Sequence, residues 1–282
     1  EQLAELTPDK IAAFTSAQVK GLTAGQVASM SSEALNSFSA AQLTTLLASQ
    51  VSALRTGQIK SFGTLQVGAL LSSQVSVLTT GQVVAIDGSD LRTMKGEQIA
   101  SFATDRVAAL TSGQVSALAG SQVSALLSAQ VRAVETADLV VLNSAQISGL
   151  STGQLNVLYS TQVKALTNDQ VQLLGVGQLG GLNTDQLNVL ESAQLNALTS
   201  GQVIGLGSGQ LRGLETTLLS ALSSRVLNTL SASQLTTLLA SQVSALKTGQ
   251  IESFGTLQVG ALLSSQVSVL TTGQVVAIDG SD

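Results

Sequence analysis

The chain has 282 residues, 12 of them basic and 17 acidic, and it contains no histidine, cysteine or tryptophan. This inventory excludes thiol chemistry, imidazole acid–base chemistry, His- or Cys-ligated zinc and the Ser-His-Asp and Cys-His triads. Charged residues make up 10% of the chain, so the surface must be largely neutral. The net charge of −5 comes without any basic cluster, which argues against a nucleic-acid partner held through its phosphates. No apolar run reaches about 18 residues, so we expect no membrane span.

One octapeptide recurs along the whole chain, from residue 1 to residue 282. Stepping by eight from Gln2 gives 36 positions, of which 28 are Gln. Written from its large apolar residue, the unit reads L-x-[ST]-[GASD]-Q-[VLI]-x-[AGSTV], as in residues 110–117. The first and sixth positions are apolar in every complete octad, whereas the Gln at the fifth position varies. We therefore interpret the chain as one continuous array of octads rather than as two domains.

A longer period lies on top of the octad. Residues 42–90 recur at residues 234–282 with two changes, Arg55 to Lys247 and Lys60 to Glu252. The two blocks are 192 residues apart, which is 24 octads, so they are in perfect register. This arrangement indicates growth of the gene by duplication of whole units.

The spacing of the apolar pair predicts an all-α solenoid with one very short capped helix in each octad. Apolar residues separated by three and then five positions cannot stay on one face of a continuous helix, and in a straight strand they would point to opposite faces. Residues three apart do share one face of a short helix. Thr7-Pro8 gives an N-cap followed by Pro at the first helical position. Val and Thr content leaves a β-solenoid as the alternative.

The capping pattern sets the expected register of each helix. With the N-cap at the second octad position, Gln is the N3 residue of a capping box. Where the second residue cannot cap, as at Arg55, we expect the following Thr56 to take over. A single octad cannot offset the entropy of its own folding, so stability must come from stacking. Small residues at the fourth and eighth positions, such as Gly113 and Ala117, should let neighbouring helices approach.

The number of octads in one coil is suggested by the aromatic residues. Four large first-position residues follow one another at intervals of 24, namely Phe14, Phe38, Phe62 and Ile86. This spacing indicates three octads per coil, although Phe102 lies off the series. The regular Gln is either a recognition stripe or a structural residue, which caps its helix or forms a hydrogen-bonded ladder between coils. We favour the structural interpretation because the position is monotonous.

Two polar motifs suggest binding sites. Asp87/Asp90 and their copies Asp279/Asp282 place two carboxylates around a Gly, a pattern that some extracellular repeats use for calcium. A helix cap at Asp87 with Asp90 at N3 explains the same residues. Paired threonines such as Thr79-Thr80 would suit an ice-binding face, but capping explains them as well. We assign no catalytic, cofactor-binding or metal-binding residue and expect neither an enzyme nor a small-molecule substrate.

In composition the chain resembles the Ser/Thr/Gly/Gln-rich repeat regions of giant bacterial adhesins. Residues 78–86 also resemble the opening helix of the DNA-reading repeats of transcription activator-like effectors, but the base-reading pair and the positive charge of that family are absent. The first resemblance implies a structural protein of the bacterial cell surface or of an extracellular filament. We expect it to associate with itself through its open solenoid ends and its neutral faces. The alternative is an α-solenoid scaffold or adhesin that binds a protein partner.

Overall fold

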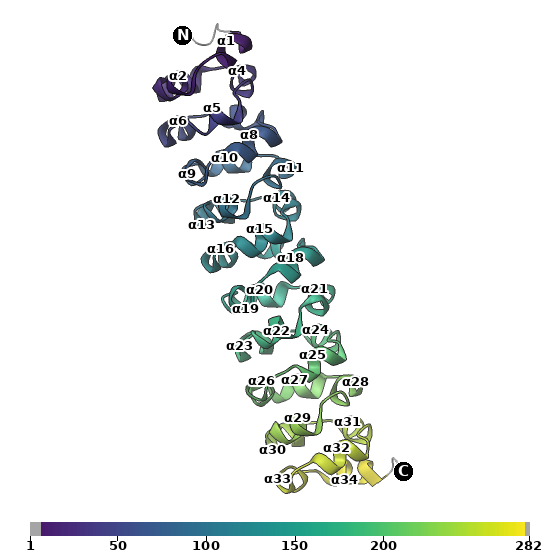
Figure 1. The fold of residues 1–282 in the computed structure, drawn as a ribbon. Helices are drawn as coiled ribbons and strands as arrows, with labels where there is room; N and C mark the ends of the chain where they lie inside the picture. Colours follow the sequence, from purple (N-terminus) through teal and green to yellow (C-terminus); the bar gives the residue numbers. More distant parts are fainter. Residues whose placement is uncertain (1–6, 280–282) are drawn as a thin grey trace. The chain divides into compact units, whose positions relative to one another are not determined.

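The structure, a computed structural model, describes residues 7–279 apart from the side chain of Asp279, and this part of the chain is helical without any strand (Figure 1). The chain forms two compact units, Glu1–Leu150 and Ser151–Asp282. The first unit contains α1 (Pro8–Ala12), α2 (Ser16–Gly21), α3 (Ala24–Ser29), α4 (Ser32–Asn36), α5 (Ala40–Leu43), α6 (Ala48–Ser52), α7 (Thr56–Lys60), α8 (Thr64–Ala69), α9 (Ser72–Val75), α10 (Thr80–Val84), α11 (Gly88–Leu91), α12 (Gly96–Ala100), α13 (Thr104–Ala108), α14 (Ser112–Ala117), α15 (Gly120–Ala125), α16 (Ser128–Ala133), α17 (Thr136–Val140) and α18 (Ser144–Gly149). The second unit contains α19 (Thr152–Asn156), α20 (Ser160–Ala165), α21 (Asn168–Leu173), α22 (Val176–Gly180), α23 (Thr184–Asn188), α24 (Ser192–Asn196), α25 (Ser200–Ile204), α26 (Ser208–Gly213), α27 (Thr216–Ala221), α28 (Ser224–Leu227), α29 (Ala232–Thr237), α30 (Ala240–Ser244), α31 (Thr248–Glu252), α32 (Thr256–Ala261), α33 (Ser264–Val267) and α34 (Thr272–Asp279).

Each described octad contains one helix, which begins at the third octad position. In α14, Thr111 at the second position is the N-cap, with extended backbone angles of φ −76° and ψ 156°. The N–H of Val115 donates to the Thr111 carbonyl at 2.9 Å, and the N–H of Leu118 donates to the Val115 carbonyl at 3.3 Å. The predicted all-α solenoid of short capped helices is confirmed, and the β-solenoid alternative is wrong for the described residues.

Consecutive helices are joined by short links that end in extended residues; after six-residue helices the link is two residues long, and after shorter helices such as α10 a residue with helical angles, Ala85, precedes these two residues. After α14, Leu118 has φ −58° and ψ 144°, and Ala119 has φ −74° and ψ 153°. These angles are open to every L-residue, and no described residue has a positive φ. The chain therefore turns between helices without any glycine in a left-handed conformation. This explains why the turn positions accept residues as different as Leu, Arg, Thr and Gly.

Helices stack in each unit on the third helix along the chain. Contacts join α8 to α11, α9 to α12 and α10 to α13 in the first unit, and α29 to α32, α30 to α33 and α31 to α34 in the second. Three octads thus form one coil, as the spacing of 24 between the large aromatic residues indicated. The first-position and sixth-position side chains, such as Leu118 and Val115, fill the interior. The residual cavities along these interiors are about 20 Å³, so the cores are closely packed.

The expectation for small residues holds at the eighth position and in part at the fourth. A Cβ on Gly149, an eighth-position residue, would lie 2.6 Å from the carbonyl oxygen of Gly120, the third-position residue 29 earlier in the chain. By contrast, a Cβ on the fourth-position residues Gly25 and Gly201 would meet nothing within 4 Å. The closest contacts between coils run between the eighth and third positions, but the fourth position also takes part in places: a Cβ on Gly81 would lie 3.4 Å from Cγ2 of Thr56, and a Cβ on Gly120 would meet the backbone of the fourth-position Ala145.

The expected takeover of the cap by Thr56 is also wrong. The N-cap of α7 is Arg55, and Thr56 is the first helical residue, so the register of the octad does not move. The backbone N–H of Arg55 donates to Oε1 of Gln58 at 2.7 Å. Because the Gln satisfies the cap backbone by itself, a capping side chain is dispensable.

Candidate functional site

The repeated Gln joins each helix both to its own cap and to the preceding coil. In α14, Oε1 of Gln114 accepts from the Thr111 N–H at 3.0 Å. On the other side of the amide, Nε2 donates to the carbonyl oxygens of Val83 at 2.9 Å and Ile86 at 2.8 Å, which lie 31 and 28 residues earlier. The same offsets recur at Gln82 and Gln186. The Gln is thus a capping residue and a ladder between coils at once.

This geometry supports the structural interpretation of the Gln and argues against its interpretation as a recognition stripe. The side chain of Gln114 is buried, and both ends of its amide have hydrogen-bond partners. A buried polar group is tolerated when its hydrogen bonds are made, and removing its partner leaves backbone groups unsatisfied. Every polar residue that is buried as a whole within the described chain lies at this N3 position.

Octads with another residue at N3 replace the Gln in different ways. Nε of Arg106 donates to the Leu78 carbonyl at 3.1 Å, 28 residues earlier, while Nη1 bonds to both carboxylate oxygens of Asp105 at 2.7 Å. That hydrogen bond lowers the pKa of the Asp105 carboxyl. Asp138 instead accepts from the hydroxyl of Ser112 at 2.5 Å. Arg106 thus supplies a donor in place of the missing Gln, whereas Asp138 has no donor and instead accepts a hydrogen bond from the preceding coil.

Two asparagines compensate for octads that carry an apolar residue at N3, and sequence reasoning missed them. Leu218 cannot accept from its cap, and the N–H of Glu215 donates instead to Oδ1 of Asn188 at 3.0 Å. Asn196 does the same for the octad of Val226, accepting from the N–H of Ser223 at 2.6 Å. The signal in the sequence is an Asn at the seventh position, four octads before the octad that lacks its Gln.

Where the Gln is present, an asparagine at the same octad position does not accept a hydrogen bond from the cap N–H. Nδ2 of Asn36 and of Asn228 donates to a carbonyl 25 residues later, at 2.8 and 2.7 Å. The corresponding cap N–H groups, on Gly63 and Gly255, already donate to Gln66 and Gln258. Oδ1 of Asn36 and of Asn228 is consequently buried without a hydrogen-bond partner. These two oxygens are explained by competition with the Gln.

The predicted acidic pair lies at the start of α11. Asp87 occupies the N-cap position, but its side chain makes no cap hydrogen bond, so the predicted helix cap is present in backbone conformation alone. Asp90 is the N3 residue and is buried. Burial, with a smaller contribution from the nearby Asp87 carboxylate, raises the pKa of Asp90. Within residues 7–279 no group of three or more acidic side chains could hold a metal ion, and the copy Asp279/Asp282 lies outside the described side chains.

Comparison with known proteins gives one family match. A family model described as the ALTTAQ repeat matches residues 83–120, 131–168 and 171–208. The chain is a tandem-repeat protein. All three matches begin at a Val in the sixth octad position, so the family unit and the octad share one register. No curated protein matches the chain.

The threonine pairs have the expected capping role. Oγ1 of Thr79 accepts from the N–H of Gln82 at 3.3 Å, and Thr271 does the same for Gln274. The second threonine of each pair, such as Thr80, is the first residue of its helix and is exposed. One residue of each pair is therefore used by the repeat itself.

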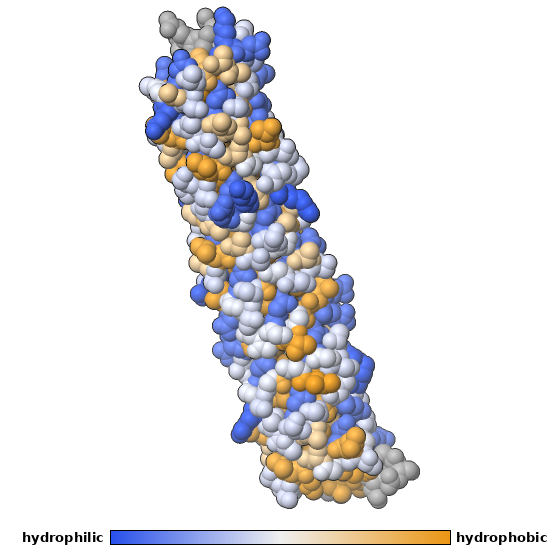
Figure 2. All heavy atoms as spheres, in the orientation of Figure 1, coloured by the Kyte–Doolittle hydropathy of each residue, from blue (hydrophilic) through white to orange (hydrophobic). Residues whose placement is uncertain are grey.

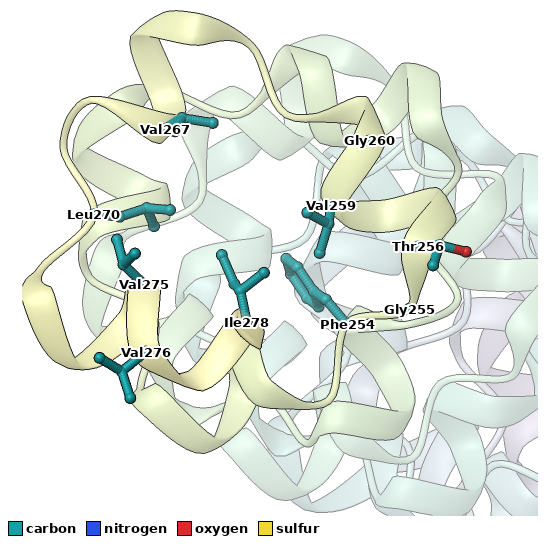
Figure 3. A pocket seen from close by; sticks show the side chains of 10 residues that line it. All are labelled: Phe254, Gly255, Thr256, Val259, Gly260, Val267, Leu270, Val275, Val276 and Ile278. Carbon is teal, nitrogen blue, oxygen red and sulfur yellow. The ribbon is translucent and has the colours of Figure 1, made fainter. Parts of the chain in front are cut away.

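One larger cavity opens at the end of the second unit. It measures about 660 Å³ and is lined by residues of α32, α33 and α34 together with Phe254 and Leu270. Figure 3 shows Phe254, Val259, Leu270 and Ile278 around this hollow, and Figure 2 shows apolar surface gathered at that end of the unit. Its lining is almost wholly aliphatic or aromatic, with no group that could act as an acid, base or nucleophile apart from the Thr256 hydroxyl. In residues 7–279 no helix is long and apolar enough to span a membrane.

Proposed function

We propose that this repeat protein is a structural component of the bacterial cell surface or of an extracellular filament, and that it has no catalytic activity. The observation that carries the proposal is the use of the buried polar side chains. The buried polar residues of the described chain lie at N3, where each Gln accepts from the N–H of its cap and Asp138 bonds to Ser112 of the preceding coil; Asp90 is the exception. An active site requires polar groups of different kinds converging on one point. Here the repeated polar group at N3 instead holds one coil to the next.

The surface chemistry supports an assembling protein. Charged residues are 10% of the chain, and uncharged surfaces do little to keep copies apart. The absence of cysteine and histidine suits a material that must not react. The placement at the cell surface rests on the compositional resemblance to adhesin repeats.

Negative-stain microscopy of the purified chain tests this proposal. A concentrated sample of the wild-type chain at neutral pH should form long regular fibres. Dispersed particles that retain one specific partner protein would overturn self-assembly and favour the scaffold or adhesin alternative. Exposed apolar side chains such as Leu65 and Leu127 would then be the first places to seek its interface.

A further inference from the structure

The sequence block that occurs twice in this chain, first at residues 42–90, exposes the same leucines in both places. Leu65 is 61% exposed and Leu71 is 45% exposed, and their equivalents 192 residues later, Leu257 and Leu263, are 80% and 45% exposed. Helices α1 to α4 precede the first block and α12 to α18 follow it within the same unit, so its leucines are exposed inside a continuing stack. The exposure is therefore a property of these octads and does not depend on a missing neighbour.

The fold does not require a leucine at these positions. Leu65 and Leu257 are the two leucines at the fourth octad position, where the other octads carry Gly, Ala, Ser, Thr or a charged residue. Leu71 is the N-cap of α9 and makes no capping hydrogen bond with its side chain. Leu47 is the N-cap of α6, which contacts α9, and it makes none either. Exposed apolar side chains that neither fill the core nor cap a helix indicate a contact made outside the chain.

The two blocks differ at two residues, and one of these differences reverses a charge. Arg55 becomes Lys247, which keeps the charge, whereas Lys60 becomes Glu252. Lys60 and Glu252 are both exposed, and within the described residues neither side chain forms an ion pair. Lys60 is the last residue of α7, and Leu65 is the second residue of α8. The charge that reverses thus lies one short link away from an exposed leucine.

This reversal decides which blocks can face each other. Two surfaces of nearly the same sequence can meet about a local two-fold axis, and residues on that axis meet their own equivalents. Two first blocks would bring together two Lys60 side chains, and two second blocks would bring together two Glu252 side chains. A first block facing a second block instead places Lys60 against Glu252. Like charges exclude the wrong pairings, and opposite charges favour the right one.

No other charge alters this preference. Residues 61–86 and their copy at residues 253–278 contain no charged residue. Arg55 and Lys247 carry the same charge, so they do not distinguish one pairing from another. The charges on the surface therefore favour contact between unlike blocks.

We propose that copies of this chain associate side by side, with the first block of one copy against the second block of another copy. The exposed leucines of one block then pack against those of the other, and Lys60 lies against Glu252. Each copy carries both surfaces, as a contact between unlike patches requires if it is to join many copies. This inference rests on the proposed function and names the surface through which copies recognise one another.

Charge reversal at the two sites tests the pairing. Lys60→Glu makes both blocks acidic at this site, and Glu252→Lys makes both basic. Sedimentation velocity of the full chain over a range of concentrations, at low ionic strength, should show association weakened by about five-fold or more in each variant. The matched control is Lys20→Glu, which makes the same change at an exposed seventh-position lysine in α2 and should associate as the wild type does.

The double variant Lys60→Glu/Glu252→Lys shows whether the two charges meet each other. It restores opposite charges with the blocks exchanged, so its association should return to that of the wild type. An equimolar mixture of the two single variants should also regain association, because each contact between unlike chains then joins an acidic block to a basic one. High salt should reduce the differences between all of these samples.

The leucines are tested separately because they contribute through apolar contact. Leu65→Gln replaces a side chain outside the core by one of similar helix propensity, so the circular dichroism spectrum should not change. Its association should weaken by about ten-fold. The matched control is Leu127→Gln, since Leu127 is 60% exposed and lies outside both blocks. The control should associate as the wild type does.

The outcomes separate this inference from the proposed function. Unchanged association in the single charge variants, or an equal loss in Lys20→Glu or Leu127→Gln, would overturn the block-to-block contact and leave self-assembly standing through other surfaces. A double variant as weak as the single variants would overturn it too, because the two charges would not meet. A wild-type chain that sediments as a monomer at every concentration would overturn both the contact and the self-assembly.

Discussion

Residues 64–86 and residues 256–278 have one sequence and begin their helices at the same positions, yet one copy is buried and the other is not. The octad therefore determines where a helix begins, while burial depends on the coil that follows. The last helices of the two copies differ as well. Helix α10 ends at Val84, whereas α34, which contacts α31 but no later helix of the described residues, continues to Asp279. The break after each helix is thus stabilised by the next coil as well as by local sequence, as expected where each repeat contacts its neighbours alone.

The largest effect should come from placing a charge in the buried copy. Val83→Asp puts a carboxylate where the wild-type side chain is fully buried, and we expect the stability of the first unit to fall by about 4 kcal/mol or more. Val275→Asp makes the same change at the same place in the identical sequence, but at a half-exposed side chain, and should cost less than about 1 kcal/mol. Urea unfolding followed by circular dichroism measures both. Similar losses in the two variants would show that local sequence, rather than the covering coil, sets the stability.

A Gln within the stack should matter more than the same residue at its end. Gln82→Ala leaves the Thr79 N–H and the Leu54 carbonyl without partners and leaves the Val51 carbonyl with its bond from the Leu54 N–H alone, at a cost of about 2–4 kcal/mol. Gln18→Ala removes one hydrogen-bonded oxygen from an exposed side chain and should cost less than about 1 kcal/mol. The difference between their urea midpoints gives the contribution of the ladder. A null difference would mean that the ladder adds nothing beyond capping.

The sequence alone predicted the local structure, because the residues that determine it lie close together in the chain. The helix in each octad, its N-cap position and the role of Gln at N3 follow from spacings of three to five residues. The bonds between coils join residues 25 to 31 apart, and their offsets depend on how three octads superpose. That geometry explains why Asn188 accepts from the cap N–H of Glu215 and why the eighth position lies against the third position of an earlier coil. Neither could be derived from propensity or capping rules.

The acidic pair illustrates the same division. Sequence reasoning placed Asp87 at an N-cap and Asp90 at N3, which the structure confirms. It assigned the cap hydrogen bond to the Asp87 side chain, which makes none. The stacking of coils buries Asp90 and thereby raises its pKa, an effect that no spacing within the octad could indicate.

A smaller effect should separate the glycines that touch the next coil from those that do not. Gly149→Ala would place a Cβ 2.6 Å from the carbonyl oxygen of Gly120, so α18 and α15 must move apart, at a cost of about 1–3 kcal/mol. Gly201→Ala, in the first turn of α25, meets nothing within 4 Å and should stabilise the chain by about 0.5–1 kcal/mol through helix propensity. Thermal unfolding of the two variants provides the comparison. A loss on Gly201→Ala would contradict the open space at that residue.

The smallest predicted effect concerns the coil that covers the first copy, which begins at α11 with Asp90 at N3. Asp90→Gln restores the repeat residue, whose Nε2 would reach the carbonyls of Ile59 and Phe62 at the usual offsets of 31 and 28. We expect a gain of about 1 kcal/mol at neutral pH, because an amide donor replaces a buried carboxylate.

Because burial raises the pKa of Asp90 in the folded chain, folding favours its protonated form. The stability that protonation contributes is therefore complete below about pH 4 and is lost as the pH rises through the folded pKa. The advantage of Asp90→Gln should accordingly shrink between pH 7 and pH 4 in urea unfolding, with Glu97→Gln as an exposed control in the next octad. A gain that stays constant over this range would mean that restoring the amide, rather than removing the charge, accounts for the whole effect.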